Sequence, residues 1–329
     1  MKLTINTKGM QLSKVNERFQ IKYGSMKEEH AATRVEQIII TNAISITSDA
    51  LELASQYNID VIFLNKYGNP YGRLWHSKMG SISTIRRKQL ELTKDTSGTI
   101  LIKEWVSQKI SNQINLLSSL KSNRTGKKVE ILQESIEKLQ EQLEKIQQLP
   151  LDTIDNLRNT IEGHEGTAGR IYFKALSSII PKEYEFSGRS RNPAKDMFNC
   201  MLNYAYGVLY SNVERSCIIA GLDPYIGIMH TDNYNKTALV FDLIEMYRAY
   251  MDEIVFKLFS TKKVKKSMFD EVEGGYWLNK EGKVLLIDAI NKRFAEKIKY
   301  KGRNIELENI IQYDCHNIAN RILKEDIAC

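Results

Sequence analysis

Residues 100–146 read ILIKEWVSQKISNQINLLSSLKSNRTGKKVEILQESIEKLQEQLEKI, and this stretch decides the fold class of the 329-residue chain. Its apolar residues recur at helical spacing on both sides of a polar turn at 122–126. From Val129 to Ile146 they alternate spacings of three and four residues, and Pro150 ends the pattern. The stretch therefore predicts a helical hairpin. Because it holds only about three heptads, helix packing within one domain is favoured over a coiled coil.

The residues before this stretch show the pattern of strands. Phe19, Ile21 and Tyr23 repeat with a period of two, and the run Ile-Ile-Ile at 38–40 is typical of a buried strand. Segments of this kind recur to about residue 75, with one short helix among them. They predict a small β-rich domain.

Helical patterns dominate from Leu151 to the last residue. The length suggests about two domains. We therefore expect an α+β fold: a small β-rich N-terminal domain at 1–80, a linker at 81–99, and a larger all-α domain at 100–329.

The composition favours an anionic partner and no membrane. Lys and Arg number 47 against 40 Asp and Glu, which leaves a net charge of +7 and attracts anions at long range. The N-terminus lacks an apolar signal segment, and no stretch approaches the ~18 apolar residues that span a bilayer. The four cysteines show no Cys-x-x-Cys pairing, which argues against disulfides and structural zinc. These features predict a cytoplasmic protein.

Three segments far apart in the sequence offer oxygen or imidazole ligands, and the first contains Glu165. It lies between Gly163 and Gly166, just before an apolar helical pattern, so we expect it near a helix start. A carboxylate there could equally do no more than complement the helix dipole. A zinc-protease motif is excluded, because Ala168 stands where His-Glu-x-x-His requires its second histidine.

The other two segments supply a histidine and two acids. His230 follows a loop with glycines and a proline at 221–227. Asp242 and Glu245 are three residues apart, so a helix would place both carboxylates on one face. A metal ion would relieve their repulsion, and so would Arg248 one turn further on. The residues alone leave open a metal site, a locally hydrogen-bonded histidine and a structural ion pair.

Longer motifs in the second half of the chain resemble one family. They are Gly-x-Glu-Gly at 163–166, Arg-Asn-Pro-x-x-Asp-x-x-Asn at 191–199, Asn-Tyr-x-Tyr-Gly at 203–207, Gly-Leu-Asp-Pro-Tyr-x-Gly-x-x-His at 221–230 and Asp-Leu-x-Glu-x-x-Arg at 242–248. In this order they resemble the CRISPR-associated adaptation integrase, a metal-dependent DNA endonuclease that inserts new spacers into CRISPR arrays. The β-rich N-terminal region is similar to that of the family as well.

The resemblance implies a catalytic metal site in the helical domain. Glu165, His230 and Glu245 would bind one Mg²⁺ or Mn²⁺, with Asp242 as an auxiliary ligand or a support for the others. Some relatives carry Asp where this chain has Glu245. The metal would polarise a phosphodiester attacked by a DNA 3′-hydroxyl, or by water when the enzyme cleaves.

Basic and aromatic residues are expected to hold the DNA. The first group lies near the expected ligands in sequence and comprises Arg170, Lys174, Arg189, Arg191 and Arg248. The second is the run Lys262, Lys263, Lys265 and Lys266, for which a solvated surface loop is the alternative. Tyr206 and Tyr172 would stack on or orient DNA, or else belong to the core.

The resemblance also implies partners. These are double-stranded and branched DNA, a second copy of the chain bound through the β-rich domain, and the small ferredoxin-like CRISPR-associated adaptation partner. Two alternatives remain: a transposon-encoded, casposon-type integrase, which would be expected to carry an added DNA-binding domain, and a catalytically silent DNA-binding scaffold.

Overall fold

The computed structural model describes residues 1–57, 59–65, 70–74, 83–191, 193–230, 236–324 and 327. The chain forms two compact units, Met1–Gly80 and Ser81–Cys329. Each unit has a hydrophobic core of its own. None of the helices in the described part of the chain is long and apolar enough to cross a membrane.

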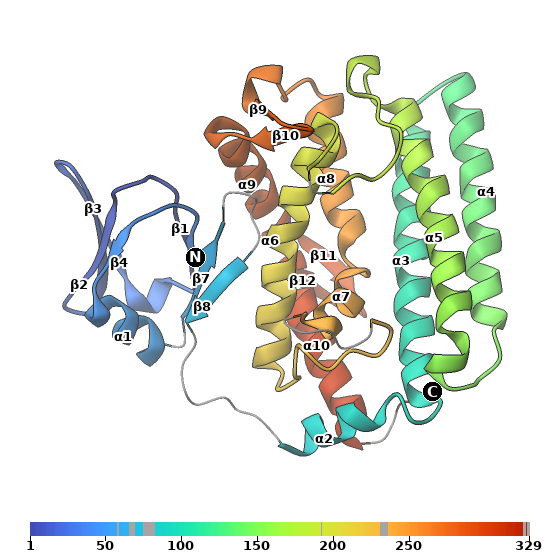
Figure 1. Cartoon of the computed structure of the whole chain (residues 1–329), viewed down its shortest axis with the longest axis horizontal. Coiled ribbons are helices and arrows are strands. Elements are labelled where there is room, and N and C mark those ends of the chain that lie inside the picture. The colour runs from blue at the N-terminus through green and yellow to red at the C-terminus, as the bar shows by residue number, and fades with distance from the viewer. Residues whose placement is uncertain are drawn as a thin grey trace. The chain divides into compact units, whose positions relative to one another are not determined.

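Two four-stranded sheets make up most of the first unit (Figure 1). The first consists, in order, of β1 (Lys2–Ile5), β5 (Gln37–Ile40), β7 (Asp60–Leu64) and β8 (Pro70–Leu74), with only β8 antiparallel to its neighbour. The second consists, in order, of β4 (Met26–Ala31), β3 (Arg18–Tyr23), β2 (Gln11–Val15) and β6 (Ser45–Ile46). The predicted β-rich N-terminal region is confirmed.

One α-helix completes the core of this unit. Helix α1 (Ser48–Gln56) packs on β2 and β7, and a 3-10 turn spans Ala32–Arg34. Phe19 and Leu53 are fully buried in this core, because the period-two face of the strands and the apolar face of α1 turn toward each other.

The second unit is built mainly from helices. They are α2 (Ser83–Glu91), α3 (Ser97–Ser122), α4 (Lys127–Gln148), α5 (Ile154–Ile179), α6 (Met197–Ile219), α7 (Ala238–Ile244), α8 (Arg248–Ser260), α9 (Lys280–Phe294) and α10 (Leu307–Lys324). Short 3-10 turns lie at Lys182–Tyr184 and Lys266–Met268. The larger helical domain predicted from the sequence is confirmed.

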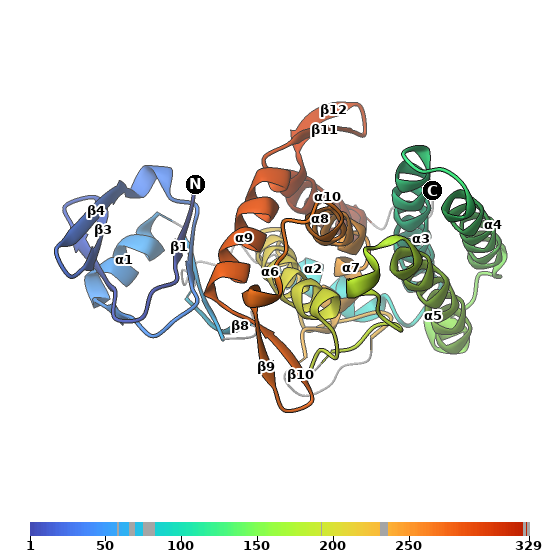
Figure 2. The same ribbon diagram turned by 90° about the horizontal axis from the view of Figure 1, so that it is seen from above.

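The predicted hairpin is the pair α3 and α4, and α5 packs on both (Figures 1 and 2). Gly126 closes the turn between them with a φ of 65°, a conformation that costs glycine little. The apolar face of α4 carries the fully buried Leu132, Leu139 and Ile146. The three-and-four spacing of the sequence thus serves helix packing within one unit.

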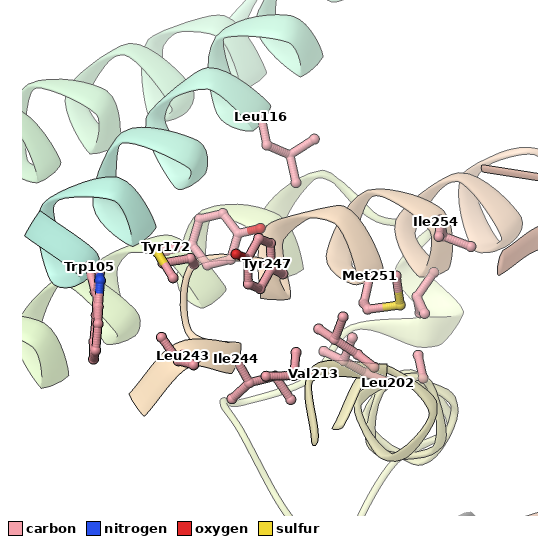
Figure 3. Packing of buried hydrophobic residues seen from close by; sticks show 14 of the residues in the cluster. Trp105, Leu116, Tyr172, Leu202, Val213, Leu243, Ile244, Tyr247, Met251 and Ile254 are labelled. Atoms are coloured by element: carbon pink, nitrogen blue, oxygen red, sulfur yellow. The ribbon is translucent and has the colours of Figure 1, made fainter. Parts of the chain in front are cut away.

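The other side of α3 and α5 meets a second group of helices. Helix α6 packs on α7, α8, α9 and α10, and α8 also contacts α3. Figure 3 shows part of this core, with labelled side chains from α3, α5, α6, α7 and α8. Tyr172 of α5 is fully buried within it. The arrangement brings α3, α5 and the junction of α7 with α8 together.

Two expectations about this unit were wrong. The segment 81–99, expected as a linker, carries α2, where Ile85 and Gln89 are buried four residues apart on one face of an otherwise polar helix. The unit is also not all-α. Two antiparallel hairpins interrupt the helices: β9 (Phe269–Val272) with β10 (Gly275–Leu278), and β11 (Lys297–Tyr300) with β12 (Arg303–Glu306). Their turns use Gly274 and Gly302 at positive φ, a turn signal that the helical spacing of the flanking residues concealed.

Candidate active site

Glu165 lies in the middle of α5, not near a helix start as its flanking glycines suggested. Gly163 and Gly166 are exposed, and a β-carbon at either position would meet no other atom within 4 Å. Each glycine costs a helix about 1 kcal/mol. Packing of α5 against α3 and α4 outweighs that cost, because tertiary contacts supply most of a helix's stability.

Lys109 of α3 joins the two predicted acidic ligands. Its Nζ lies 2.5 Å from Glu165 Oε1 and 2.5 Å from Glu245 Oε2. All three side chains are largely buried, with exposed fractions of 13% for Lys109, 18% for Glu165 and 9% for Glu245. Burial alone would lower the pKa of Lys109, but Glu245 and Glu165 raise it above its ordinary value. The lysine is therefore a buried ammonium shared by two carboxylates.

Sequence reasoning missed Lys109, although a signal was present. On α3 it shares a face with the buried Ile102, Val106 and Gln113. A lysine in the buried register of a helix needs a charge partner. The periodicity thus predicts that Lys109 has a partner. It cannot identify Glu165, which lies 56 residues away.

Glu245 follows α7 directly and precedes α8. Its Oε1 forms an ion pair with Arg248 Nη1 at 2.7 Å, which the spacing of three residues along the chain allows. Burial by itself would raise the pKa of the Glu245 carboxyl, but Arg248 and Lys109 lower it to about 2. The other oxygen, Oε2, lies 2.5 Å from the Lys109 ammonium. Glu245 is therefore a buried carboxylate whose two oxygens face two different cations.

Asp242 has a different set of partners from Glu245. Its carboxylate is fully buried and accepts hydrogen bonds from the backbone N–H groups of Ile228, Met229 and His230, at 2.7, 3.1 and 3.0 Å. It also lies 2.7 Å from Nδ1 of His230. The two acids of the 242–248 motif therefore do not share a cation: Asp242 holds the histidine loop, and Glu245 faces Lys109.

This contact orients the His230 ring. A carboxylate only accepts hydrogen bonds, so Nδ1 carries the proton and the lone pair of a neutral ring lies on Nε2. Among the described residues, none bonds to Nε2, and the side chain is 45% exposed. The hydrogen bond to Asp242 raises the pKa of His230 despite the opposing effect of burial. The ring is fixed at Nδ1 and meets no described partner at Nε2.

Two further side chains, Gln89 and Arg158, hold the loop that leads to His230. Gln89 of α2 is buried and donates from Nε2 to the carbonyls of Asp223 and Ile226, both at 2.8 Å, while its Oε1 accepts from the Asp223 amide at 3.0 Å. Arg158 of α5 donates to the carbonyls of Ile228 and Met229. Neither Gln89 nor Arg158 was predicted, because local patterns do not show which polar side chain reaches a distant backbone.

Gly227 is required by the same loop. A β-carbon there would lie 2.5 Å from the β-carbon of Ala238 and 2.5 Å from the carbonyl oxygen of His230. Both distances are below van der Waals contact, and backbone cannot give way cheaply. The glycine lets the loop pass closely over the start of α7.

Four of the predicted DNA contacts, Tyr172, Tyr206, Arg189 and Arg248, are engaged inside the protein. The Tyr206 hydroxyl donates to Asp252 Oδ1 at 2.5 Å, and the Arg189 and Arg248 guanidinium groups lie 5.1 and 4.9 Å from the Tyr206 ring centre. Arg189 also bonds to the side chains of Asn199 and Asn203. Burial raises the pKa of the Asp252 carboxyl to about 6, against hydrogen bonds from Tyr206 and Tyr172 that lower it.

The remaining basic residues lie on the surface. Arg170, Lys174 and Arg191 are exposed, as are the four lysines of the run at 262–266. Lys262 occupies a turn after α8 with a φ of 57°. These placements allow DNA contact, which stays a prediction.

The three predicted metal ligands are not gathered in the structure as it stands. In the part of the chain that the structure describes, no three His, Cys, Asp or Glu side chains form a group that could hold a metal ion. Glu165 and Glu245 nevertheless converge on one cation, the Lys109 ammonium. Two carboxylates and the Nε2 nitrogen of a neutral imidazole are donors that suit Mg²⁺ or Mn²⁺. The donor set fits, with a lysine between two of its members.

Known structures share this two-unit fold. A Cas1 protein from Thermotoga maritima superposes with a TM-score of 0.83 at 20% identity, over 98% of this chain and 97% of that one. A casposase bound to integration product gives a TM-score of 0.83 at 20% identity, over 98% and 91%. The fold is therefore that of the Cas1-like proteins.

Sequence comparison identifies the family. The model of the family described as CRISPR associated protein Cas1 matches residues 3–292. The CRISPR-associated endonuclease Cas1 1 of Archaeoglobus fulgidus is 31% identical over 295 residues, which cover 87% of this chain and 85% of the relative. The chain belongs to the Cas1 family, as the motifs at 163–248 predicted.

Proposed function

We propose that this protein is a metal-dependent DNA endonuclease and integrase that inserts protospacer DNA into a CRISPR array. One observation carries the proposal: Glu165 of α5 and Glu245 of the α7–α8 junction converge on a single cation at 2.5 Å each. Membership of a family with relatives named endonuclease supports the same activity.

Glu165, His230 and Glu245 would hold the divalent cation. His230 would bind through Nε2, because Asp242 keeps the proton on Nδ1. Glu245 would bind through Oε2, the oxygen that faces the same cation as Glu165, because Oε1 pairs with Arg248. When bound, Mg²⁺ or Mn²⁺ would supply Lewis-acid polarisation of the scissile phosphodiester.

Other residues of the protein orient the proposed ligands and would hold the DNA. Asp242 fixes the ring and the backbone of the His230 loop, so that Nε2 keeps one direction. Arg248 helps to keep Glu245 ionised, and its positive charge lies beside the site. Arg170, Lys174 and Arg191 would contact phosphates of the bound strand, because they are exposed and basic. The nucleophile would be a DNA 3′-hydroxyl in strand transfer and water in cleavage.

The partners follow from the family. We include in the proposal a homodimer formed through the β-rich unit, and a complex with the small ferredoxin-like CRISPR-associated partner. Branched and double-stranded DNA would be the substrate. The basic surface residues favour such a polyanion.

A strand-transfer assay tests the proposal. Purified protein receives a branched DNA substrate with Mn²⁺, Mg²⁺ or chelator, and the variants are Glu165→Gln, His230→Ala and Glu245→Gln. We expect each variant to lose at least about 100-fold in rate. Glu253→Gln is the matched control, since Glu253 pairs with Lys257 and Arg293 away from the proposed ligands.

The same assay distinguishes the proposed enzyme from a catalytically silent DNA-binding scaffold. A scaffold would bind the substrate but release no transferred or cleaved product with any metal. Full activity in all three ligand variants would remove the proposed site while leaving family membership intact.

A further inference from the structure

Lys109 holds the place between Glu165 and Glu245 that a shared cation would take. Its Nζ is equidistant, at 2.5 Å, from one oxygen of each carboxylate. The three side chains come from α3, α5 and the α7–α8 junction. An ammonium bridging these two carboxylates neutralises the same charges as a bound metal ion.

The charge balance depends on this lysine. Among the described residues, Lys109 is the one cation in ion-pair contact with Glu165, whereas Glu245 also has Arg248. The carboxylates are largely buried, with exposed fractions of 18% and 9%. Buried charges left without a partner are strongly unfavourable. Without Lys109 the pair would therefore attract another cation strongly.

The ammonium and a divalent ion exclude each other at this point. Mg²⁺ binds carboxylate oxygens at about 2.0–2.1 Å. An ammonium 2.5 Å from the same two oxygens would lie too close to the double charge, and the repulsion between them is large in a poorly hydrated site. One cation must leave before the other binds.

We propose that Lys109 is a built-in counter-ion that competes with the divalent metal and transfers to a substrate phosphate when the metal binds. The inference rests on the proposed function, and it adds a mechanism by which the metal and the DNA reinforce each other's binding. Lysine suits this role, because its ammonium is a compact charge on a flexible four-carbon stem. A phosphate oxygen beside the site would receive the displaced ammonium.

Competition makes the metal site weak in the absence of DNA. Only the fraction of molecules in which Lys109 has swung away can bind the ion, which reduces the apparent affinity by that fraction. DNA that captures the ammonium raises this fraction. By linkage, the metal tightens DNA binding by the same factor as the DNA tightens metal binding.

The test measures Mn²⁺ binding to the full-length protein by electron paramagnetic resonance, without DNA. We expect Lys109→Met to bind Mn²⁺ about tenfold more tightly than wild type, because the competing charge is gone. The matched control is Lys103→Met on the same helix, since Lys103 donates to the Leu149 carbonyl and pairs with no carboxylate among the described residues. The control should leave the affinity for Mn²⁺ unchanged.

A second measurement, of melting temperature, tests whether the substitution changes the stability of the fold. In the presence of chelator, Lys109→Met should have a lower melting temperature than wild type. Added Mn²⁺ should raise the melting temperature of Lys109→Met more than it raises that of wild type. Lys109→Gln, which keeps a hydrogen-bond donor, should behave in the same direction. A third measurement adds duplex DNA, which should tighten Mn²⁺ binding in wild type and do so markedly less in Lys109→Met.

Two failures are distinguishable. If Glu165→Gln and Glu245→Gln abolish Mn²⁺ binding but neither Lys109 variant tightens it, the counter-ion role is wrong and the metal site stands. If the carboxylate variants bind Mn²⁺ as wild type does, the proposed metal site itself is wrong. Tighter binding in both lysine variants, lost again when Glu165→Gln is added, supports the inference.

Discussion

Asp242 and His230 are joined twice: Oδ1 of Asp242 accepts from the His230 amide at 3.0 Å and lies 2.7 Å from His230 Nδ1. One carboxylate therefore fixes both the backbone and the ring of the same residue. Because Asp242 also accepts from the amides of Ile228 and Met229, a change there reaches the entire loop.

Asp242→Asn is expected to impair the site without removing a metal ligand. An amide presents N–H groups where the carboxylate accepted hydrogen bonds, so backbone donors lose their partner. We expect a loss of about 1–3 kcal/mol in the free energy of unfolding and a fall of about 10- to 100-fold in metal affinity or strand transfer. Calorimetry and the branched-DNA assay would measure these. The exposed Asp270→Asn should change neither, and a wild-type rate for Asp242→Asn would contradict the role of Asp242.

Tyr206→Phe is expected to destabilise the protein in a pH-dependent way. Burial raises the pKa of Asp252 to about 6, and the Tyr206 hydroxyl acts against this by donating to the ionised form. Because the folded pKa lies above the unfolded value of roughly 3.9, ionising Asp252 costs stability as the pH rises from about 4 through about 6. Phenylalanine removes a donor and raises that pKa further.

The cost of Tyr206→Phe should therefore be larger at pH 8 than at pH 5. We expect about 1.5–3 kcal/mol above the pKa, the range for hydrogen bonds to charged groups. Denaturant unfolding at both pH values measures it. The ring stays in place between Arg189 and Arg248, so a cost that is equal at both pH values would show that Asp252 is not the partner that matters.

Gln89→Ala tests whether α2 positions the histidine loop. The change leaves the carbonyls of Asp223 and Ile226 without the donor that Gln89 supplies. We expect about 1–3 kcal/mol of destabilisation, together with weaker Mn²⁺ binding, because His230 lies further along the same loop. Gln108→Ala is the control, since Gln108 is exposed and bonds only to Asn112 among its described partners. Equal Mn²⁺ affinity in both variants would show that α2 does not position the metal site.

The salt dependence of DNA binding tests the role of the lysine run at 262–266. Replacing Lys262, Lys263, Lys265 and Lys266 by alanine should weaken DNA binding and flatten its dependence on salt. The slope of log K against log salt concentration should fall by about 0.9 for every phosphate that is no longer neutralised. Fluorescence anisotropy at several salt concentrations measures the slope, with the exposed pair Lys127 and Lys128 of α4 as the control. An unaltered slope would favour the surface-loop interpretation.

Much of the fold was predictable because it follows local rules. The spacing in 100–146 predicts α3 and α4, since the period of an amphipathic helix is visible within a few turns. The glycines at 163 and 166 suggested a helix start that the structure does not have. Each costs the helix about 1 kcal/mol, and the packing of α5 on two neighbouring helices outweighs that cost. The polar α2 was hidden for a similar reason: only Ile85 and Gln89 of this helix are buried.

The sequence by itself determined the family, the two-part architecture and three segments that carry acids and a histidine, since these depend on order and spacing along the chain. Only the tertiary structure decided how those groups are paired. It placed Lys109 between Glu165 and Glu245, and Asp242 under His230. Electrostatic partners are chosen by distance in space, and Lys109 and Glu165 lie 56 residues apart in the chain. No local pattern contains that information.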